Sequence, residues 1–243
     1  MYTLHDVGDQ ALLVEFENEI SMEVNRKVVA LKRALEERRL PGIGELIPTY
    51  RSLVIHYDPL TADLDQLKQA IDQGVKHLDL SSLPKSIVTE IPVLYEGEYA
   101  LDLEEIARIE GKTEEEIIRI HSQSDYYVYM LGFAPGHPYT ARFENPFSFK
   151  RRSEPRVKIP AGSVGIAGSQ TGVYPIDSPG GWQLIGLTPV RMYDPDRAEP
   201  ILPKAGEYIK FYSITKAEFD EIAAQEAAGT YVCKRHPRKE GAK

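Results

Sequence analysis

The stretch "PAGSVGIAGSQTGVYPIDSPGGWQLIG", from Pro160 to Gly186, sets the expectation for the fold. Seven of the eighteen glycines of the chain lie between Gly162 and Gly186. Glycine permits conformations and close approaches that a Cβ atom forbids, so the backbone here either turns tightly at several points or approaches a ligand. The segments "SVGIAG", "GVYPI" and "WQLIG" between the turns are short and rich in β-forming residues. The stretch predicts short strands joined by turns, and it leaves open whether the fold or a ligand requires the glycines.

The same pattern continues on both sides of this stretch. From "YYVYMLGF" to "YIKFYSI", residues 126–214, short apolar segments alternate with glycine and proline turns, which favours a closed or nearly closed β-barrel. Helices are predicted before it in "LDLEEIARIEG" and "KTEEEIIRIHSQS", where Thr113 and Glu116 form a capping-box pattern. We therefore expect a mostly β domain over 85–243, with a helical lead-in at 102–123 and a flexible basic tail from about 233 to 243.

The first 84 residues predict a separate small α+β domain. Two strand-like segments, "TLHDVG" and "ALLVEFE", precede a helix with Ser21 as N-cap, and "GELIPTYRSLVIHYD" supplies two more strands before a second helix. The order ββαββα favours two helices on one face of an antiparallel sheet. The apolar stripes of the two helices are Val24, Val28, Leu31 and Leu35 in the first and Leu64, Leu67 and Ile71 in the second.

Composition excludes several classes of protein. The formal net charge of −8 disfavours nonspecific binding to nucleic acid or to anionic membranes. No segment approaches the roughly 20 apolar residues that cross a bilayer, and "MYTLHDVGDQALLVEF" lacks the features of a signal peptide, so we expect a cytoplasmic protein. The single cysteine, Cys233, excludes an intramolecular disulfide and a cysteine-based zinc cluster.

The common catalytic motifs are missing from the sequence. It contains no Walker loop, no GxGxxG between a strand and a helix, no HExxH and no GxSxG. A nucleotide, if one is used, is not expected to bind through a phosphate loop of this chain. Asp177 and Glu144 are the acids nearest to the glycine-rich loops and are candidate bases, whereas His56 and His121 are predicted to be structural.

A basic run, "KRRSEPRVK" from Lys150 to Lys158, precedes the glycine-rich stretch with five cations and one anion. It is either a solvated loop or a site for an anion such as phosphate or carboxylate. Because Arg156 and Lys158 alternate with Val157 and Ile159, strand periodicity places both cations on one face and the apolar pair toward a core. Arg156 is accordingly either a two-bond clamp for a carboxylate or a charge that protects a sheet edge.

Two further groups of residues offer binding chemistry. The loop "GFAPGHPY" follows an apolar strand and presents Phe133, His137 and Tyr139. Trp182 either forms the floor of a pocket or fills the core. The glycine-rich stretch offers neutral donors that suit a carbonyl oxygen or an oxyanion, namely Ser163, Ser169, Gln170, Thr171, Tyr174 and Ser178.

The motifs "YMLGFAPGHPY", "PRVKIPAGSVGIAGSQTGVYPIDSPGGWQLIGLTP" and the later "FYSI" closely resemble the allophanate hydrolase subunit 1 family, which includes the B subunit of 5-oxoprolinase and the sporulation kinase A inhibitor KipI. The resemblance implies a cyclophilin-like β-barrel with these loops around a pocket. The sequence departs from the family pattern at His137, at Thr140 and around "RFENPF". The family pattern and the residue chemistry together give the substrate-binding candidates Phe133, Pro135, Gly136, His137, Arg156, Lys158, Pro160, Gly162, Ser163, Gln170, Thr171, Gly172, Tyr174, Ser178, Gly180, Gly181 and Trp182, and no catalytic residue is assigned.

The resemblance also implies a function that needs partners. Family members act with a subunit 2 type chain, which is the KipA type or the C-type subunit of 5-oxoprolinase, and we expect an A-type subunit as well. The implied activity is ATP-dependent opening of 5-oxo-L-proline to L-glutamate, with ATP used by the complex, no metal or biotin site in this chain, and no activity of this chain alone. Two alternatives stay open: inhibition of a sporulation histidine kinase, and half of a biotin-dependent carboxyltransferase or allophanate hydrolase-like module.

Overall fold

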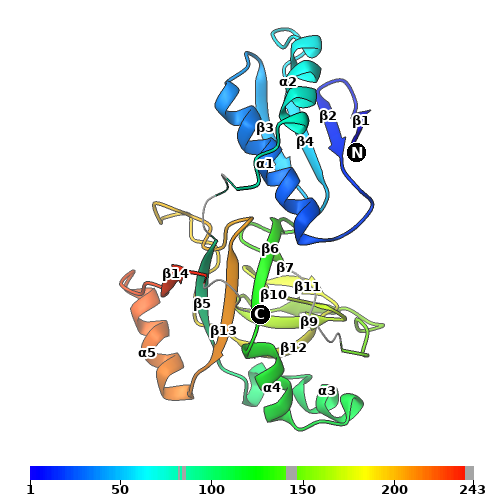
Figure 1. Ribbon diagram of the computed structural model, residues 1–243. Helices are drawn as coiled ribbons and strands as arrows, with labels where there is room; N and C mark the ends of the chain where they lie inside the picture. The colour runs from blue at the N-terminus through cyan, green and yellow to red at the C-terminus, as the bar shows by residue number, and fades with distance from the viewer. Residues whose placement is uncertain (82, 84–85, 141–146, 239–243) are drawn as a thin grey trace. The chain divides into compact units, whose positions relative to one another are not determined.

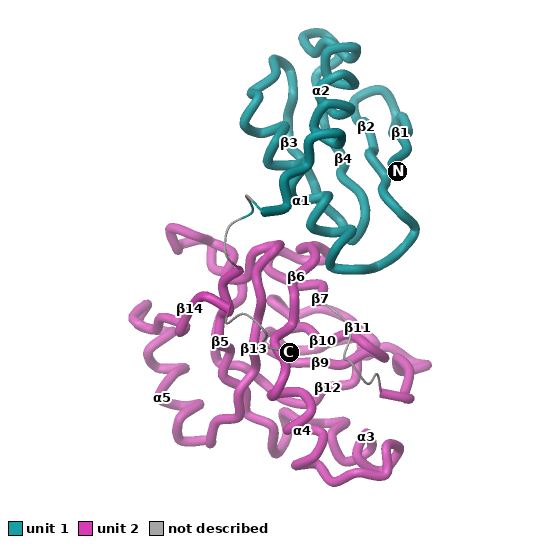
Figure 2. The backbone as a smooth tube through the Cα atoms, viewed as in Figure 1, with its two compact units in different colours: residues 1–84 teal, residues 85–243 magenta. Residues whose placement is uncertain are grey.

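The computed structural model describes residues 1–81, 83, 86–140 and 147–238. The chain divides into two compact units, residues 1–84 and residues 85–243 (Figure 2). Each unit has its own core of buried apolar side chains, and the two cores share no residue. We therefore describe each unit by itself.

The N-terminal unit is one four-stranded antiparallel sheet with two helices on one face (Figure 1). The strand order in the sheet is β1-β2-β4-β3. Along the chain the elements are β1 (Thr3–Asp6), β2 (Ala11–Glu15), α1 (Met22–Arg38), β3 (Ile43–Pro48), β4 (Ser52–Tyr57) and α2 (Leu64–Lys76).

Local sequence signals account for both helices of this unit. The Ser21 side chain accepts a hydrogen bond from the Val24 N–H and begins α1, and the Asp63 side chain does the same for α2 with the Gln66 N–H. The predicted apolar stripe of α1 is buried along its whole length. In α2 the inner residues of the stripe are buried, whereas Leu64 at the first turn is exposed. Both stripes pack on β2 and β4, and this contact supplies the core.

The C-terminal unit is built from three sheets and four helical segments in its described residues. The sheets have the orders β14-β5-β13-β6-β7, β10-β9-β12 and β11-β8. All their strand pairs are antiparallel except β5 with β13, which is parallel. The elements are β5 (Ile87–Val93), the 3₁₀ helix η1 (Gly97–Tyr99), α3 (Leu103–Glu110), α4 (Glu114–Ser122), β6 (Asp125–Leu131), β7 (Pro138–Thr140), β8 (Arg156–Ile159), β9 (Ser163–Ala167), β10 (Gln170–Val173), β11 (Ser178–Gly180), β12 (Gln183–Leu187), β13 (Tyr208–Ser213), α5 (Lys216–Ala227) and β14 (Arg235–Pro237).

The sequence predicted a closed or nearly closed barrel, and closure is not seen in the described residues, where the strands of this unit belong to three separate sheets. A barrel needs one continuous ladder of hydrogen bonds around the axis. Here the strands are short, and the pairing of β12 with β9 shifts register between Leu184 and Gly186. The sheets are held together by a shared apolar core, to which β5, β9, β12, α3 and α4 all contribute. A cyclophilin-like arrangement stays a prediction of the resemblance.

Close packing of the backbone explains much of the glycine content of the quoted stretch. Gly162 has φ +84°, and a Cβ atom there would lie 2.5 Å from the Thr188 carbonyl oxygen. A Cβ on Gly180 would lie 2.3 Å from the Tyr174 hydroxyl. At both positions a side chain would collide with protein atoms. The fold therefore requires these glycines, whether or not a ligand binds nearby.

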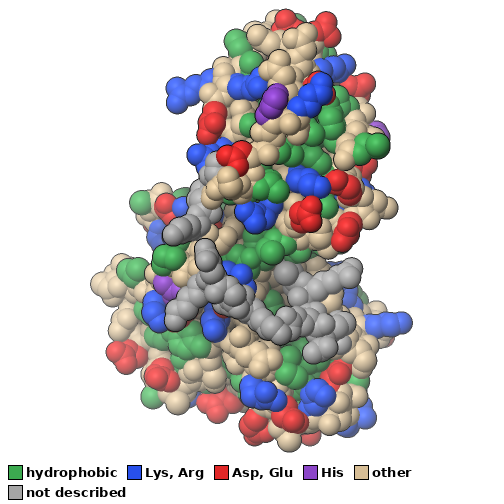
Figure 3. Space-filling view, viewed as in Figure 1, with side chains coloured by type: hydrophobic (Ala, Val, Ile, Leu, Met, Phe, Trp, Pro, Cys, Tyr) green, Lys and Arg blue, Asp and Glu red, His purple; other side chains and the backbone are tan. Residues whose placement is uncertain are grey.

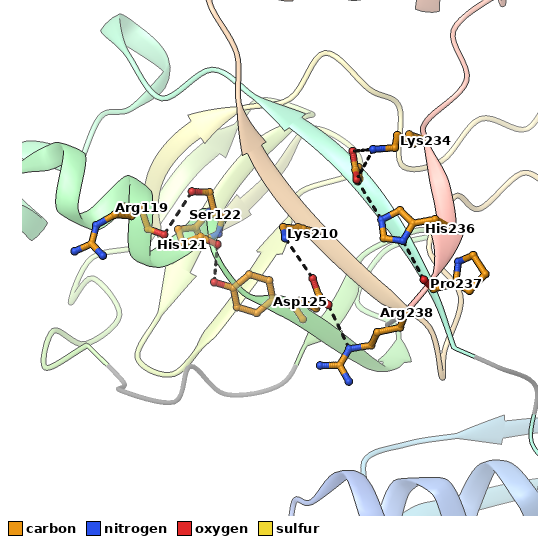
Figure 4. A network of polar contacts seen from close by, with 11 residues as sticks. Arg119, His121, Ser122, Asp125, Lys210, Lys234, His236, Pro237 and Arg238 are labelled. Carbon is orange, nitrogen blue, oxygen red and sulfur yellow. Dashed lines mark hydrogen bonds and ion pairs between the residues drawn. The ribbon is translucent and has the colours of Figure 1, made fainter. Parts of the chain in front are cut away.

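The predicted flexible tail is wrong for residues 233–238, which are part of the fold. Cys233 is buried, and β14 extends the five-stranded sheet by pairing antiparallel with β5. Figure 4 shows the polar contacts of this segment. The Lys234 ammonium and the His236 ring contact the Glu90 carboxylate, and the Arg238 guanidinium forms an ion pair with Asp125. Of the cations that suggested a solvated tail, Lys234, Arg235 and Arg238 pair with Glu90, Glu207 and Asp125. Residues 239–243 are outside the described part of the chain.

Helix α5, just before this strand, was not expected. Its N-terminus carries a capping box, in which the Thr215 side chain accepts from the Glu218 N–H and the Glu218 carboxylate accepts from the Thr215 N–H. The T-x-x-E pattern in "TKAE" is a readable signal for this start. No side chain of the helix is fully buried, so the apolar periodicity that identifies a helix is weak.

The structure is consistent with the composition in two respects. On the face shown in Figure 3, basic and acidic side chains are interspersed over both units, so no single basic surface is seen there. Among the helices of the described residues, none is both long and apolar enough to cross a bilayer.

Candidate functional site

His137, just before β7, is the centre of a cluster of aromatic rings. The residue is only 3% exposed. The distance between ring centroids is 5.1 Å to Tyr139, 5.6 Å to Phe133, 5.6 Å to Trp182 and 5.9 Å to Tyr174. The loop "GFAPGHPY" and the glycine-rich stretch, which are separate in sequence, therefore meet at this imidazole.

The protonation of His137 follows from its surroundings. Burial lowers the pKa of the imidazole, and the positive charge of Arg151 lowers it further. The ring is therefore neutral at pH 7. Nδ1 lies 2.9 Å from the Val173 carbonyl oxygen, which only accepts hydrogen bonds, so Nδ1 carries the proton. Nε2 is left as an acceptor and has no hydrogen-bond partner among the described residues.

Phe133 has the least ordinary backbone of the cluster. It is one of two described non-glycine residues with positive φ, at 62°, and its side chain is 64% exposed. Two hydrogen bonds hold the loop, from the Ala134 N–H to the Gly132 carbonyl and from the His137 N–H to the Ala134 carbonyl. Gly136, with φ +84°, packs against the Met192 carbonyl oxygen. An exposed aromatic side chain in a strained conformation marks this loop as a candidate for ligand contact.

The basic run divides into paired and unpaired cations. The Arg156 Nη2 donates to Asp102 Oδ1 at 2.7 Å, and the Arg152 Nη1 lies 3.3 Å from the same oxygen. Lys158 pairs with Asp177 at 2.8 Å on an exposed surface. The guanidinium of Arg151 lies over the Trp182 ring, 5.7 Å from its centroid. Arg152 and Arg156 thus share the single negative charge of Asp102, and Lys158 forms an exposed pair with Asp177.

Asp102 was missed by the sequence analysis, although it organises this region. It is 5% exposed, and its Oδ2 accepts a hydrogen bond from the Leu184 N–H at 2.6 Å. Its position before α3 is a weak signal, because an Asp there suggests a helix cap, yet its side chain caps no helix N–H. Asp102 and Arg156 are 54 positions apart in the chain, so no local sequence pattern predicts the pair.

The expected alternation in β8 is wrong at one position. Ile159 is fully buried, but Val157 is 91% exposed and faces no core. The reason is that, in the described residues, β8 is paired only with the short strand β11, in an irregular register, and no described element covers the side of the strand where Val157 lies. Arg156 is folded back onto Asp102, and its Nη1 is buried without a hydrogen-bond partner in the described part of the chain, as is the Ser178 Oγ.

Thr171 lies inside the protein, in a buried chain of hydrogen bonds. Its Oγ1 donates to the Gly165 carbonyl and therefore accepts from Nε2–H of His121, at 2.7 Å. His121 Nδ1 then accepts from the Tyr95 hydroxyl at 2.6 Å. Burial lowers the pKa of His121 to about 3, so this ring is neutral. The side chain of Thr171 positions β10 against α4 and is not exposed to a ligand.

The remaining candidates are spread over several environments. Gly172 packs against His137, and Tyr174 and Trp182 are buried in a small cluster with Ile159. Ser163 is buried, whereas Pro135 and Pro160 are exposed. Gln170, Ser178, Gly162, Gly180 and Gly181 are half-buried, and of these Gly181 is the least crowded, because a Cβ placed there would meet no atom closer than 3.7 Å.

The other groups considered for chemistry are poor candidates for it. The Asp177 carboxylate accepts from Lys158 and from the Ala161 N–H, which lowers its pKa and makes it a weak base. Burial raises the pKa of the Cys233 thiol to about 12, so it is not a reactive nucleophile. His56 is exposed on β4, and Glu144 lies outside the described residues. In the described part of the chain, His, Cys, Asp and Glu form no group that could hold a metal ion.

The chain is similar to known proteins of one family. A sequence family described as carboxyltransferase domain, subdomain C and D, matches residues 2–203. The B subunit of 5-oxoprolinase from Bacillus subtilis (strain 168) is 40% identical over 228 residues, which cover 90% of this chain and 95% of that protein. The B subunit of 5-oxoprolinase from Escherichia coli O157:H7 is 37% identical over 206 residues, 84% of this chain and 93% of that one.

A solved structure is also similar. The crystal structure of TTHA0988 matches with a TM-score of 0.75 and 36% identity over 85% of this chain. The match covers 40% of that protein, so this chain spans less than half the length of the solved relative.

Proposed function

Because the chain belongs to the family of 5-oxoprolinase B subunits, we propose that it acts within an ATP-dependent 5-oxoprolinase, which opens 5-oxo-L-proline to L-glutamate. The observation that carries the proposal is the identity of 40% and 37% to two proteins of that name, over nearly their full lengths. In our proposal the loops that meet at His137, with the exposed Phe133 and the Arg151 guanidinium over Trp182, are the candidate region for the substrate.

The chemistry explains why ATP is needed. A lactam carbonyl is a poor electrophile, since the ring nitrogen donates electron density to it. Transfer of the γ-phosphoryl group of ATP to the carbonyl oxygen activates the carbon toward water. Attack by one water breaks the C–N bond of the ring and gives a γ-acyl phosphate, and a second water hydrolyses this acyl phosphate to the carboxylate of glutamate and free phosphate. Phosphoryl transfer depends on groups that cradle the phosphates, commonly a glycine-rich loop with a lysine. The sequence carries no such loop, so in our proposal ATP is used by the complex and this chain is inactive alone.

The proposed partners are a C-type subunit, also called the KipA type, and an A-type subunit. The relatives are themselves named as one subunit of an enzyme, which supports the existence of others. We expect copurification of a stable heteromer with more than roughly 1,200 Å² of buried surface, the lower range for specific complexes. Failure to associate at micromolar concentration would count against the assembly.

The decisive experiment is glutamate release from 5-oxo-L-proline in the presence of ATP. The chain is assayed alone, with the C-type partner, and with both partners. We expect ATP-dependent glutamate only with the partners present. No glutamate from the full assembly, when each chain is folded by its thermal melt, would refute the proposed function.

A second candidate follows from the description of the matching family as a carboxyltransferase domain. In this alternative the chain is half of a biotin-dependent carboxyltransferase or allophanate hydrolase-like module. Avidin separates the two proposals, since it binds biotin and would stop carboxyl transfer but leave 5-oxoproline hydrolysis intact. Inhibition of a sporulation histidine kinase stays a prediction of the sequence resemblance, and suppression of kinase autophosphorylation by this chain alone is its test.

A further inference from the structure

The edges of two sheets meet beside the candidate region. β7 is the last strand of the five-stranded sheet, and β10 is the last strand of the three-stranded sheet. The two strands are in contact, but in the described part of the chain they share no backbone ladder. We call this junction, residues 137–140 and 170–173, the seam. Its backbone carbonyls need hydrogen-bond donors that a neighbouring strand does not supply.

Side chains supply these hydrogen bonds. The Thr140 hydroxyl donates to the Thr171 carbonyl at 2.6 Å and accepts from the Thr171 N–H at 3.3 Å. His137 Nδ1–H donates to the Val173 carbonyl at 2.9 Å. Thr140 is 1% exposed, so water does not compete for its hydroxyl. One buried hydroxyl thus satisfies both backbone groups of Thr171, as the backbone of a neighbouring strand would.

The β10 side of the seam is fixed from within the protein. The Thr171 side chain is fully buried, where it accepts from His121 Nε2–H at 2.7 Å and donates to the Gly165 carbonyl at 3.1 Å. His121 is held in turn by the Tyr95 hydroxyl at 2.6 Å. Thr140 therefore attaches β7 to a strand whose own position is determined by α4 and β9.

Gly172 allows the close approach of the two strands. A Cβ atom at this position would lie 3.1 Å from the Pro138 carbonyl oxygen and 3.4 Å from Cε1 of His137, so a side chain would push β7 outward. The approach places the His137 ring 5.6 Å from Trp182 and 5.6 Å from Phe133. The seam therefore sets where the loop of residues 132–137 lies relative to the glycine-rich stretch.

We propose that Thr140 is a positioning residue for the reaction. Its hydroxyl holds β7 on β10, and so keeps the loop of residues 132–137 against the glycine-rich stretch in the arrangement that receives 5-oxo-L-proline. This assignment rests on the proposed function and adds a residue that acts through the loop without touching the substrate.

The test uses the assembled complex and four variants of this chain. Thr140→Val removes the hydroxyl with little change in shape, and Thr140→Ser restores it. Gly172→Ala strains the seam without removing a hydrogen bond, and it serves as a second perturbation if Thr140→Val does not fold. Thr89→Val is the matched control, because the Thr89 hydroxyl is buried on β5 without a hydrogen-bond partner among the described residues. The thermal melt, kcat and the KM values for 5-oxoproline and ATP are measured for each.

For Thr140→Val we expect KM for 5-oxoproline to rise by roughly tenfold to a hundredfold, as for a misplacement of about 1 Å in a site. KM for ATP should not change, since in our proposal ATP binds elsewhere in the complex. Thr140→Ser should recover most of the affinity, Gly172→Ala should raise the same KM, and Thr89→Val should behave like the wild type. A merely structural loss would reduce the amount of active complex, and so lower kcat while leaving both KM values unchanged.

A second readout needs no substrate. Trp182 is the only tryptophan of the chain, is 5% exposed and lies beside His137. When the seam loosens, acrylamide reaches this ring more easily. Quenching of the fluorescence of the full chain should therefore be stronger for Thr140→Val and Gly172→Ala than for Thr89→Val.

An unchanged KM for 5-oxoproline in the folded seam variants, or a loss confined to kcat, would overturn the role of Thr140 and leave the proposed function in place. A raised KM without stronger quenching would overturn the seam as the route by which Thr140 acts. A wild-type complex that does not hydrolyse 5-oxoproline would overturn the proposed function, and this assignment with it.

Discussion

Among single residues, Asp102 does the most to shape the candidate site. Its carboxylate accepts from Arg156, Arg152 and the Leu184 N–H, and so joins the basic run to α3 and β12. Two arginines share its single negative charge, whereas the Arg151 guanidinium lies over the Trp182 ring. A buried acid of this kind distinguishes structural cations from those that are free to bind a ligand.

We predict that Asp102→Asn lowers the free energy of unfolding by about 1.5–3 kcal/mol, the usual range for hydrogen bonds to a charged group. An amide has one acceptor oxygen and cannot satisfy both the guanidinium and the Leu184 N–H. Urea denaturation monitored by Trp182 fluorescence measures the change. Asp220→Asn, which breaks an exposed pair with Lys216, is the control and should cost less than about 1 kcal/mol. Equal costs for both variants would refute the structural role of Asp102.

His121 gives a prediction about pH. Burial lowers its folded-state pKa to about 3, whereas the unfolded chain titrates near 6.5. Below pH 6.5 the unfolded state therefore binds a proton that the folded state does not, and stability falls as the pH falls toward 3. The loss is about 1.4 kcal/mol per pH unit for one proton.

The measurement is the free energy of unfolding between about pH 6.5 and 4.5 for the wild type and for His121→Gln. The unfolding free energy of the wild type should fall more steeply with decreasing pH than that of the variant, by about 1.4 kcal/mol per pH unit. The other acids contribute to both profiles, so they do not affect this difference. Parallel pH profiles would show that His121 does not stay neutral in the folded protein.

At the scale of elements, β14 is a strand formed by a charged segment with little β-propensity of its own. Its backbone pairs with β5, and Lys234 and Arg238 pair with Glu90 and Asp125 (Figure 4). Arg235 pairs with Glu207. Without β14 and the residues beside it, the edge of β5 would be open, Glu90 and Glu207 would lose these cations, and Asp125 would keep Lys210. The strand is short, so its stability depends on these partners and not on local propensity.

We predict that ending the chain after Cys233 destabilises the C-terminal unit, whereas ending it after Arg238 does not. The longer deletion removes the ladder hydrogen bonds and three ion pairs, for a loss of about 2–4 kcal/mol and a fall in Tm of roughly 5–15 °C. Calorimetry of the two truncated chains gives the comparison. If both melt like the full chain, β14 is not a stabilising part of the sheet.

At the scale of the whole molecule, the division into two units has a consequence for proteolysis. Each unit has a separate core, and the boundary lies between residues 84 and 85. We predict that limited proteolysis cuts between about Leu78 and Ser86 and releases a C-terminal fragment that stays folded, as expected for units that own their cores. Mass spectrometry locates the cut, and circular dichroism of the purified fragment tests its fold. Cooperative loss of the whole chain, with no stable fragment, would show that the units depend on each other.

Some of this structure was readable from the sequence because it depends on near neighbours. The caps at Ser21 and Thr113 accept hydrogen bonds within one turn, as their spacing predicted. The stripe of α1 is buried because helical period alone places its residues on one face. The glycines of the stretch from Pro160 to Gly186 predicted close backbone contacts, because glycine lacks a Cβ atom. They did not predict which atoms the backbone contacts.

Only the tertiary structure determined which residues of the candidate site are buried and which contact one another. Periodicity predicted a buried Val157, but burial depends on what packs against β8, and in the described residues nothing covers that side. The sequence left Arg156 as either a clamp for a carboxylate or a charge at a sheet edge, and the structure places its guanidinium on Asp102, 54 positions away in the chain. Ion pairs and ring contacts of this kind join residues that are distant in the chain, and their energy depends on distance and burial in space. Sequence patterns report only which residues are available for such contacts, and the fold determines which of them meet.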